Sequence, residues 1–340
     1  MDTLWVRMPI LKNIIWGASA HDEIVERICR QGGITMADLD KADMKLSLQQ
    51  NCALMEAALQ LSGDPHLGLH IGQRTTVSVL GMAGYLMQSS EDLLTALQLL
   101  QQFTASFSML YTFRLEVKNE HALYYCEPVE VWNDVSPATA RQSVDIAFAG
   151  ALHILRLLSG RGIRPLKAMY RYARIGSTEE HERVLHCRPI FDQPCNAIVF
   201  SLTDLKQKII GHDRVLNETF RQLLEQKMKS DKGSPLVRQV QTVILEKSRT
   251  AFPTIDEVAA QMHFTPRTLQ RKLQDEGVSF RTLCDTIKKD IAISLLSLGK
   301  LSVSEIADRT GYTDATAFQR AFRLWTGESP GAYRQKAGPP

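Results

Sequence analysis

The apolar and polar positions of the C-terminal third follow the spacing of short amphipathic helices. Apolar side chains recur every three or four residues from Phe318 to Trp325, which places them along one side of a helix. Asp314 stands before this helix as a capping residue, and Gly311 stands where the preceding helix ends, at a position that often needs a positive φ. The pattern predicts one helix around 306–307, a tight turn and a second helix, which together form a helix-turn-helix unit.

The same arrangement occurs a second time, upstream. Thr254 and Glu257 have the spacing of a capping box at the start of one helix, and Thr265 followed by Pro266 begins another. When Thr265 is aligned with Asp314, the two units match position by position. Leu269 then corresponds to Phe318, Gln270 to Gln319, Arg271 to Arg320 and Leu273 to Phe322. Two complete units in one chain are a far more specific signal than one.

The segment between the two units predicts a single connecting helix. Its apolar positions share one helical face and are Leu283, Ile287, Ile291, Leu295 and Leu298. A helix of about 18–20 residues is roughly 30 Å long at 1.5 Å per residue. Such a helix could hold two recognition helices about 34 Å apart, which is one turn of DNA. An enzyme would have no need of this geometry.

These two units and their connecting helix resemble the AraC/XylS family of bacterial transcription regulators over about 235–335. The resemblance implies a DNA-binding domain with base-facing positions at Arg267, Gln270, Arg271, Ala315, Thr316, Gln319 and Arg320. Lys272 and Arg323 are predicted to face the phosphates. Ala315 is too short to hydrogen-bond a base edge, so the second unit is expected to read less sequence directly. Arg320 either contacts a base or clamps a phosphate or a neighbouring carboxylate.

In the first two thirds of the chain, the spacing of apolar residues is typical of helices in some segments and of strands in others. Residues 21–62 predict helices, and alternation over 111–117 predicts a half-buried strand that turns back into 122–126 as a hairpin. Ser136 and Pro137 begin a long apolar helix that runs to Ser159. Further helices are predicted over 66–73, 80–88, 178–185 and from a cap at Ser90 to about Phe107, and strands over 164–170 and 197–200. The fold class is therefore α+β: helices plus a small, mainly antiparallel sheet.

This region also resembles the arabinose-binding-type N-terminal domain of some AraC-like regulators, such as the ornithine-utilisation regulators, over about 25–205. The motifs that carry the resemblance are Leu61–Pro65, Leu67–Leu69, Leu80–Tyr85, Phe191 and Asn196–Phe200. It implies a small-molecule effector, but members respond to diverse molecules and the label does not indicate a sugar. The residue types suited to an effector pocket are Tyr85, Arg114, Tyr124, Trp132 and Arg141.

Three parts are expected along the chain. Residues 1–205 form the α+β effector domain, 206–234 a helix and linker, and 235–337 the all-α domain with two helix-turn-helix units. The helix over 213–228 is charged and amphipathic. It either packs on its own domain or contributes to a homodimer, and its sequence does not distinguish the two.

The composition is that of an ordinary globular protein and does not by itself indicate a binding partner. The 340 residues are 44% hydrophobic and 23% charged, as in ordinary globular proteins. The net charge of +3 is the sum of +4 for residues 235–340 and −1 for residues 1–234. Six scattered cysteines without a CxxC pair are expected to be free thiols in a reducing cytoplasm. His181, His186, Cys187 and Cys195 do not have zinc-ligand spacing, so no metal or other cofactor is expected. Without an apolar stretch of about 18 residues, a cytoplasmic protein with no membrane partner is predicted.

The leading interpretation is an effector-responsive activator that binds promoter DNA and contacts RNA polymerase. One alternative is a ligand-independent regulator whose N-terminal domain only dimerises or binds a protein. Another is an enzyme fused to this DNA-binding module, such as the DNA-alkylation repair proteins. Those enzymes carry a four-cysteine metal site, which this chain lacks, and the chain has no GxSxG, P-loop or HExxH motif. A regulator without enzymatic activity is therefore expected.

Overall fold

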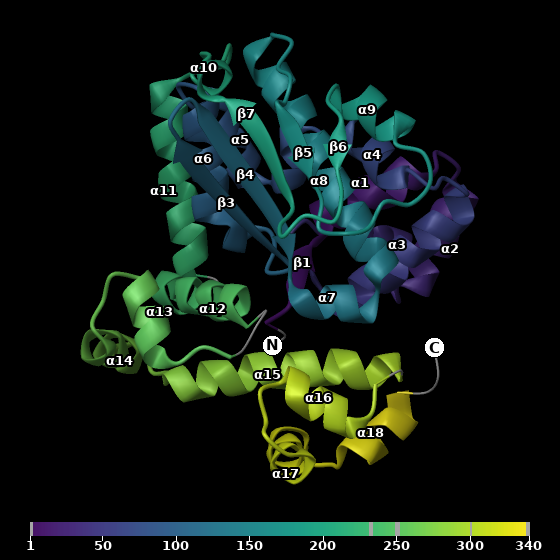
Figure 1. The fold of residues 1–340 in the computed structure, drawn as a ribbon, viewed down its shortest axis with the longest axis vertical. Coiled ribbons are helices and arrows are strands. Elements are labelled where there is room, and N and C mark those ends of the chain that lie inside the picture. The colour runs from purple at the N-terminus through teal and green to yellow at the C-terminus, as the bar shows by residue number, and fades with distance from the viewer. Residues whose placement is uncertain (1–2, 231–233, 249–251, 300, 338–340) are drawn as a thin grey trace. The chain divides into compact units, whose positions relative to one another are not determined.

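The computed structural model describes residues 3–230, 234–248, 252–299 and 301–337, and the packing of the chain divides into two compact units (Figure 1). The larger unit comprises Trp5–Pro128 and Ser136–Met228, and the smaller unit comprises Met1–Leu4, Val129–Val135 and Lys229–Pro340. This division places a short middle segment with the C-terminal helices. The domain boundaries at 205 and 235 stay a prediction, and residues 231–233 of the expected linker lie outside the described residues.

A five-stranded sheet forms one layer of the larger unit. Its strand order is β3-β4-β7-β5-β6, and every pair is antiparallel except β5 with β6. The bounds are β3 (Tyr111–Lys118), β4 (His121–Pro128), β5 (Lys167–Met169), β6 (Pro189–Ile190) and β7 (Ala197–Ser201). The predicted hairpin is confirmed, with Asn119 at φ 52° in its turn. A separate two-stranded sheet pairs β1 (Trp5–Arg7) with β2 (Lys45–Ser47).

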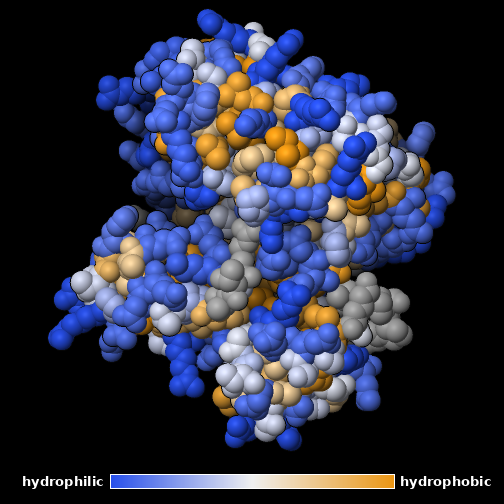
Figure 2. Space-filling view, viewed as in Figure 1, coloured by the Kyte–Doolittle hydropathy of each residue, from blue (hydrophilic) through white to orange (hydrophobic). Residues whose placement is uncertain are grey.

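Helices cover one face of this sheet, as the ribbon shows for α8 and α6 (Figure 1). The helices are α1 (Met8–Ala18), α2 (Asp22–Gln31), α3 (Leu48–Ser62), α4 (Leu67–Gly72), α5 (Met82–Gln88), α6 (Leu93–Phe103), α8 (Pro137–Ser159), α9 (Glu179–Leu185), α10 (Leu202–Leu205) and α11 (Arg214–Ser230). The 3₁₀ turns are η1 (Met36–Asp40), η2 (Val77–Leu80) and η3 (Thr104–Ser106). Hydrophobic side chains also gather on the surface where β4, β7 and β5 lie (Figure 2). The predicted α+β fold is thus confirmed.

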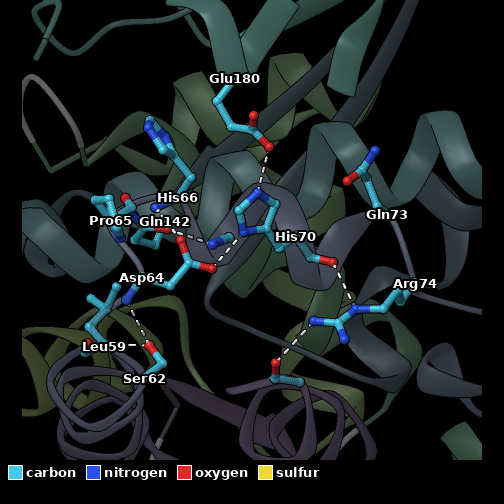
Figure 3. Close-up of polar contacts among 12 residues, drawn as sticks. Leu59, Ser62, Asp64, Pro65, His66, His70, Gln73, Arg74, Gln142 and Glu180 are labelled. Carbon is cyan, nitrogen blue, oxygen red and sulfur yellow. Dashed lines mark hydrogen bonds and ion pairs between the residues drawn. The ribbon is translucent and has the colours of Figure 1, made fainter. Parts of the chain in front are cut away.

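The central helix α8 receives α4 at very close range. A Cβ added to Gly72 would lie 2.5 Å from the Cβ of Ala149, so only glycine allows this approach. Gly68 meets the same helix, and its N–H donates to Oε1 of Gln142 at 2.6 Å. Gln142 in turn donates to the carbonyl of Pro65 at 2.8 Å (Figure 3). Backbone and side chain together therefore fix α4 on α8.

His70 connects α4 to α9. Its Nδ1 lies 2.5 Å from Asp64 and its Nε2 lies 2.5 Å from Glu180 (Figure 3). Burial by itself would lower the pKa of His70, but the hydrogen bonds to the two carboxylates raise it. A hydrogen bond from Arg183, and then one from His70, lower the pKa of Glu180 to about 2. His70 is therefore a bridging side chain in this cluster.

One predicted helix start is wrong. Asp92, not Ser90, caps α6, because Oδ1 of Asp92 accepts the N–H of Thr95 at 2.8 Å. The hydroxyl of Ser90 instead donates to the carbonyl of Leu86 at 2.9 Å and so closes the end of α5. Helix α6 also ends at Phe103 and continues as η3, so it is shorter than predicted. Ser90 and Asp92 stand two residues apart and both have capping side chains, so the sequence alone does not show which of them begins α6 until the end of the preceding helix is known.

Helices make up the smaller unit. They are α7 (Glu130–Val135), α12 (Pro235–Lys247), α13 (Ile255–Gln261), α14 (Pro266–Asp275), α15 (Phe280–Leu298), α16 (Val303–Arg309), α17 (Ala315–Thr326) and α18 (Pro330–Ala337). The pairs α13–α14 and α16–α17 form the two predicted helix-turn-helix units, and the 19-residue α15 joins them. Leu283, Ile287, Ile291 and Leu295 are buried as predicted, while the side chain of Leu298 lies outside the described part.

None of the helices in the described ranges is both long and apolar enough to cross a membrane.

Candidate nucleic-acid interface

The first helix of each helix-turn-helix unit begins with the same local structure. In the first unit, Thr254 accepts the N–H of Glu257, and Glu257 accepts the N–H of Thr254 at 2.7 Å. In the second, Ser302 and Glu305 form the same reciprocal pair, also with a 2.7 Å bond. The box around Thr254 is the predicted one. Each carboxylate occupies the positive end of its helix, where it satisfies a backbone donor.

The turns that follow also share one hydrogen-bond pattern. The N–H of Phe264 donates to the carbonyl of Ala259 at 2.8 Å, and the N–H of Tyr312 donates to that of Ala307 at 2.9 Å. The residue before each donor is left-handed, at φ 56° for His263 and 71° for Gly311. This is the usual way in which a helix end satisfies its last carbonyls. The positive φ predicted for Gly311 is confirmed. His263, at the matching place in the first turn, also has a positive φ, but a histidine in the sequence does not predict one.

The recognition helices α14 and α17 start from predicted caps. Thr265 accepts the N–H of Thr268 at 3.2 Å, and Asp314 accepts the N–H of Ala317 at 2.8 Å. The second turn contains one additional residue, Thr313, before its cap. The two units therefore align on their recognition helices, as the sequence indicates, but with a one-residue difference in the turn.

The inner faces of α14 and α17 are buried at the aligned positions. Leu269 and Leu273 on α14 are 0% exposed, and so are Phe318 and Phe322 on α17. Rings extend the second core: Tyr312 lies 5.8 Å from Phe318, and Tyr333 of α18 lies 5.6 Å from Phe322. Trp325 lies 6.5 Å from Phe322. The first unit thus has an aliphatic core and the second an aromatic one.

The outer face of α14 presents the predicted hydrogen-bond donors. Arg267, Gln270 and Arg271 are exposed, and their side chains make no hydrogen bond or ion pair with any described residue. The ammonium of Lys272 lies 5.5 Å from the ring centre of Phe264, at the edge of the same face. Arginine and glutamine that have no partner in the protein can donate in pairs to guanine or adenine edges.

The outer face of α17 is polar but shorter in reach. Thr316, Gln319, Arg320 and Arg323 are exposed, and Ala315 is half-buried. The side chain of Arg320 makes no ion pair with a carboxylate of the described residues, and its contact with a base or a phosphate stays a prediction. Sequence reasoning missed Leu324, which is 86% exposed and stands four residues after Arg320 on this face. Leu324 could have been identified from the sequence, because it is an apolar residue that does not share the helical face of Phe318 and Phe322.

A half-buried cation, Lys288, joins helix α15 to the second turn. The Nζ of Lys288 lies 4.6 Å from the ring centre of Phe252 and 4.6 Å from that of Tyr312. Burial lowers the pKa of Lys288, because the charged form loses solvation. A cation between two rings is a favourable arrangement. Lys288 therefore fixes the turn of the second unit on the connecting helix.

The five residues predicted for an effector pocket do not gather in one place. Tyr85 is exposed on α5 and stacks on Phe220 at 5.8 Å, and Trp132 is buried on α7. Arg141 on α8 lies 5.9 Å from the ring centre of Tyr172. These three residues come from different helices, and Trp132 belongs to the smaller unit whereas Tyr85 and Arg141 belong to the larger one.

The remaining two effector candidates lie on adjacent strands. The guanidinium of Arg114 on β3 lies 3.6 Å from the ring centre of Tyr125 and donates to Glu116 at 3.1 Å. Tyr124 on β4 is buried, stacks on Phe113 at 5.7 Å and lines an apolar cavity. Because Tyr124 and Tyr125 are neighbours along a strand, their side chains point to opposite faces of the sheet. Of the five, Tyr124 is the residue that the fold places at a cavity.

The described residues contain no group of three or more His, Cys, Asp or Glu side chains that could hold a metal ion. None of the six cysteines forms a disulfide. Burial raises the pKa of Cys52 to about 12 and that of Cys284 to about 11. A thiol with so high a pKa is a poor nucleophile at neutral pH.

Two capped helix pairs, each with a buried inner face and an unpaired polar outer face, define a double helix-turn-helix DNA-binding regulator. Comparison with known families agrees. Residues 25–209 match the arabinose-binding domain of AraC transcription regulator, N-terminal, and residues 258–336 match a helix-turn-helix domain. The chain belongs to the AraC family of transcription regulators.

Several known proteins resemble the chain over most of its length. An ornithine utilization regulator from Pseudomonas aeruginosa is 26% identical over 302 residues, covering 87% of this chain and 86% of that protein. The regulator VirS from Mycobacterium tuberculosis is 23% identical over 305 residues, covering 87% and 86%. The crystal structure of the transcriptional regulator CdpR from Pseudomonas aeruginosa has 22% identity and a TM-score of 0.45, with 92% of this chain and 97% of that chain covered.

Proposed function

We propose that this regulator is an effector-responsive activator of transcription that reads two successive major-groove segments of promoter DNA. The observation that carries the proposal is the pair of exposed recognition faces on α14 and α17, joined by α15. The 19 residues of α15 correspond to a length of about 28 Å. That length suits two recognition helices separated by about one turn of DNA, roughly 34 Å.

The two faces are proposed to divide the work of recognition. Arg267, Gln270 and Arg271 reach base edges from α14, and Thr316, Gln319 and Arg320 do so from α17. Ala315 supplies only an apolar contact, since a methyl group can touch a thymine methyl but cannot hydrogen-bond. Lys272 and Arg323 contact phosphates, which adds affinity without sequence preference.

Selection of binding sites from random duplexes, followed by footprinting with the full-length protein, tests this arrangement. The expected footprint has two protected segments about one helical turn apart. A variant with Gln270→Ala and Arg271→Ala should lose protection of one segment, and one with Thr316→Ala and Arg320→Ala should lose the other. A single protected segment that both variants weaken equally would contradict the proposal.

Activation through RNA polymerase is the finer part of the proposal. It is supported by the expectation from family resemblance, and a transcription assay can test it with purified bacterial polymerase. The template carries the selected site upstream of a weak promoter. The expected result is more transcript in the presence of the regulator, and less transcript would make it a repressor.

A second candidate function for the larger unit is homodimerisation through α11. Phe220 and Leu224 of this helix pack on the core, whereas Val215, Leu216 and Leu223 of the same helix are exposed. An apolar row on a charged helix favours a contact with another protein surface. Sedimentation of the full-length protein and of Leu216→Lys tests this, with Glu225→Lys, an exposed position on the far side of the same helix, as the control. A wild type that remains monomeric at micromolar concentration would exclude the dimer.

A further inference from the structure

The larger unit contains a partly open apolar cavity of about 90 Å³ that none of its predicted motifs indicates. The cavity lies between α8 and the β3–β4 hairpin and is bordered by α6, η2 and α1. All these elements belong to one compact unit. The space is therefore a feature of that unit by itself.

Small residues on α8 create the space. Ala147, Gly150 and Ala151 stand three and four residues apart, so they share one helical face, and all three line the cavity. Around them the same helix buries large side chains such as Phe148 and Leu155. A Cβ added to Gly150 would lie 3.5 Å from Thr75, an ordinary contact. Unlike Gly72, this glycine is thus not required for close helix packing, and the cavity is where its missing side chain would extend.

Aromatic rings form the opposite wall. Tyr111 stacks on Phe113 at 5.7 Å, and Phe113 stacks on Tyr124 at 5.7 Å, so three rings follow one another across the two strands. Tyr111 and Phe113 are only half-buried although they belong to the core side of the sheet. Rings with accessible surface beside a cavity can make stacking or edge contacts with a ligand.

The polar groups at the cavity are already hydrogen-bonded within the protein. The amide of Asn13 donates to Thr75 at 3.1 Å, and Thr75 donates to the carbonyl of Ile71 at 2.9 Å. Ser143 donates to the carbonyl of Ala140 at 2.6 Å. The residues that line the cavity include no Asp, Glu, Lys or Arg. A charged amino acid or a sugar rich in hydroxyls would lose its hydration there without compensation.

We propose that this cavity binds a small, uncharged, apolar molecule, up to the size of a single aromatic ring, as the ligand of the larger unit. An apolar cavity of about 150 Å³ stays dry and binds benzene. The cavity here is smaller, so a ring enters with small shifts of the half-buried rings of Tyr111 and Phe113. This inference rests on the proposed function in one respect, because it assumes that the apolar ligand is the effector to which the regulator responds. It departs from the sugar in the description of the matching domain, because the lining is apolar.

Thermal unfolding of the full-length protein with toluene as the probe tests the site. Toluene is expected to raise the melting temperature in proportion to its occupancy. Sodium benzoate, which adds a charge to the same ring, and arabinose should each leave it unchanged at equal concentration. Stabilisation by arabinose or benzoate but not by toluene would overturn the proposal.

A substitution that fills the cavity can be compared with a matched substitution outside it. Ala151→Leu places a side chain in the cavity and should abolish the toluene shift, whereas Ala138→Leu on the exposed start of α8 should retain it. If Ala151→Leu does not fold by circular dichroism, Gly150→Ala serves instead and should reduce the shift. A full toluene shift in a folded cavity-filling variant would place toluene elsewhere and overturn the site.

DNA binding measured in parallel separates this proposal from the proposed function. A toluene shift that Ala151→Leu abolishes, with DNA affinity unchanged by toluene, would keep the ligand site and refute its role as effector site. Absence of any toluene shift, with DNA binding that responds to another small molecule, would refute the site and keep the effector-responsive regulator.

Discussion

The two helix-turn-helix units have the same frame but different interiors and different faces. Both start from a capping box, close their turn with the same backbone hydrogen bond and bury two side chains at matching positions of the recognition helix. The first buries two leucines and presents Arg267 beside Gln270 and Arg271, while the second buries a set of rings and presents the shorter Thr316 beside Gln319 and Arg320. Backbone hydrogen bonds thus define the shape of the unit, whereas side chains separately define its stability and its recognition.

The largest expected effect distinguishes the two interiors. Phe318→Ala should lower the free energy of unfolding by about 3–5 kcal/mol, because truncation of a buried ring leaves a cavity. The aligned Leu269→Ala should cost about 2–5 kcal/mol, and less than Phe318→Ala, because a leucine side chain fills a smaller volume than a ring. Urea unfolding of the full-length variants measures both. If Phe318→Ala unfolds like the wild type but does not bind DNA, its ring lies on the DNA-facing side and the comparison of cores is wrong.

The recognition faces should differ next. Gln270→Ala or Arg271→Ala should weaken binding by about 1–3 kcal/mol and relax preference at one or two base pairs. Gln319→Ala on α17 is expected to cost less, because Thr316 stands where α14 has Arg267 and supplies a shorter and weaker donor beside it. Titrations on the selected site and its single-base variants measure both. Uniform weakening of every sequence by Gln270→Ala would make α14 a phosphate clamp instead of a reading helix.

Phosphate contacts should behave alike in the two units. Lys272→Ala and Arg323→Ala should each weaken all sequences equally and reduce the slope of log affinity against log salt by about 0.9, the value for one phosphate. Binding at several salt concentrations gives the slope. Ala substitution of Lys289, which is half-buried on α15, is the control that should leave the slope unchanged. A sequence-dependent loss for Lys272→Ala would move it to the base-reading set.

The smallest effect compares the two capping boxes by their pH dependence. A backbone hydrogen bond from Thr254 lowers the pKa of Glu257, and a side-chain hydrogen bond with Ser302 lowers that of Glu305. Stabilisation from a carboxylate with a lowered pKa is present above its ordinary pKa of 4.5 and is lost as pH falls through the folded-state value.

Glutamine can occupy the same position of a capping box but does not titrate. Glu257→Gln and Glu305→Gln should therefore be less stable than the wild type at pH 7 and should approach it at acidic pH. Melting temperatures across the range from neutral to acidic pH measure the difference. A constant difference across this range would show that the charge of these carboxylates contributes nothing.

Sequence patterns predicted the parts of the fold that depend on neighbours along the chain. The caps at Thr254, Thr265 and Asp314, the positive φ of Gly311 and the long α8 all involve contacts within a few residues. The same reasoning failed at Ser90 and Asp92, where both side chains can cap a helix. The choice there followed from where α5 ends, which depends on its packing against the core.

The sequence by itself determined the class of this protein, because the two helix-turn-helix units are local structures. Their helices and turns depend on capping residues, turn residues and the spacing of apolar residues. The sequence also identified which side chains of α14 face outward, because the apolar positions of an amphipathic helix mark its buried side and leave the polar positions on the outer side. Only the tertiary structure decided that His70 bridges two carboxylates and that small residues of α8 face a row of rings across a cavity. Those arrangements join segments far apart in the chain, and their geometry depends on how helices and sheet pack, for which no residue spacing carries a signal.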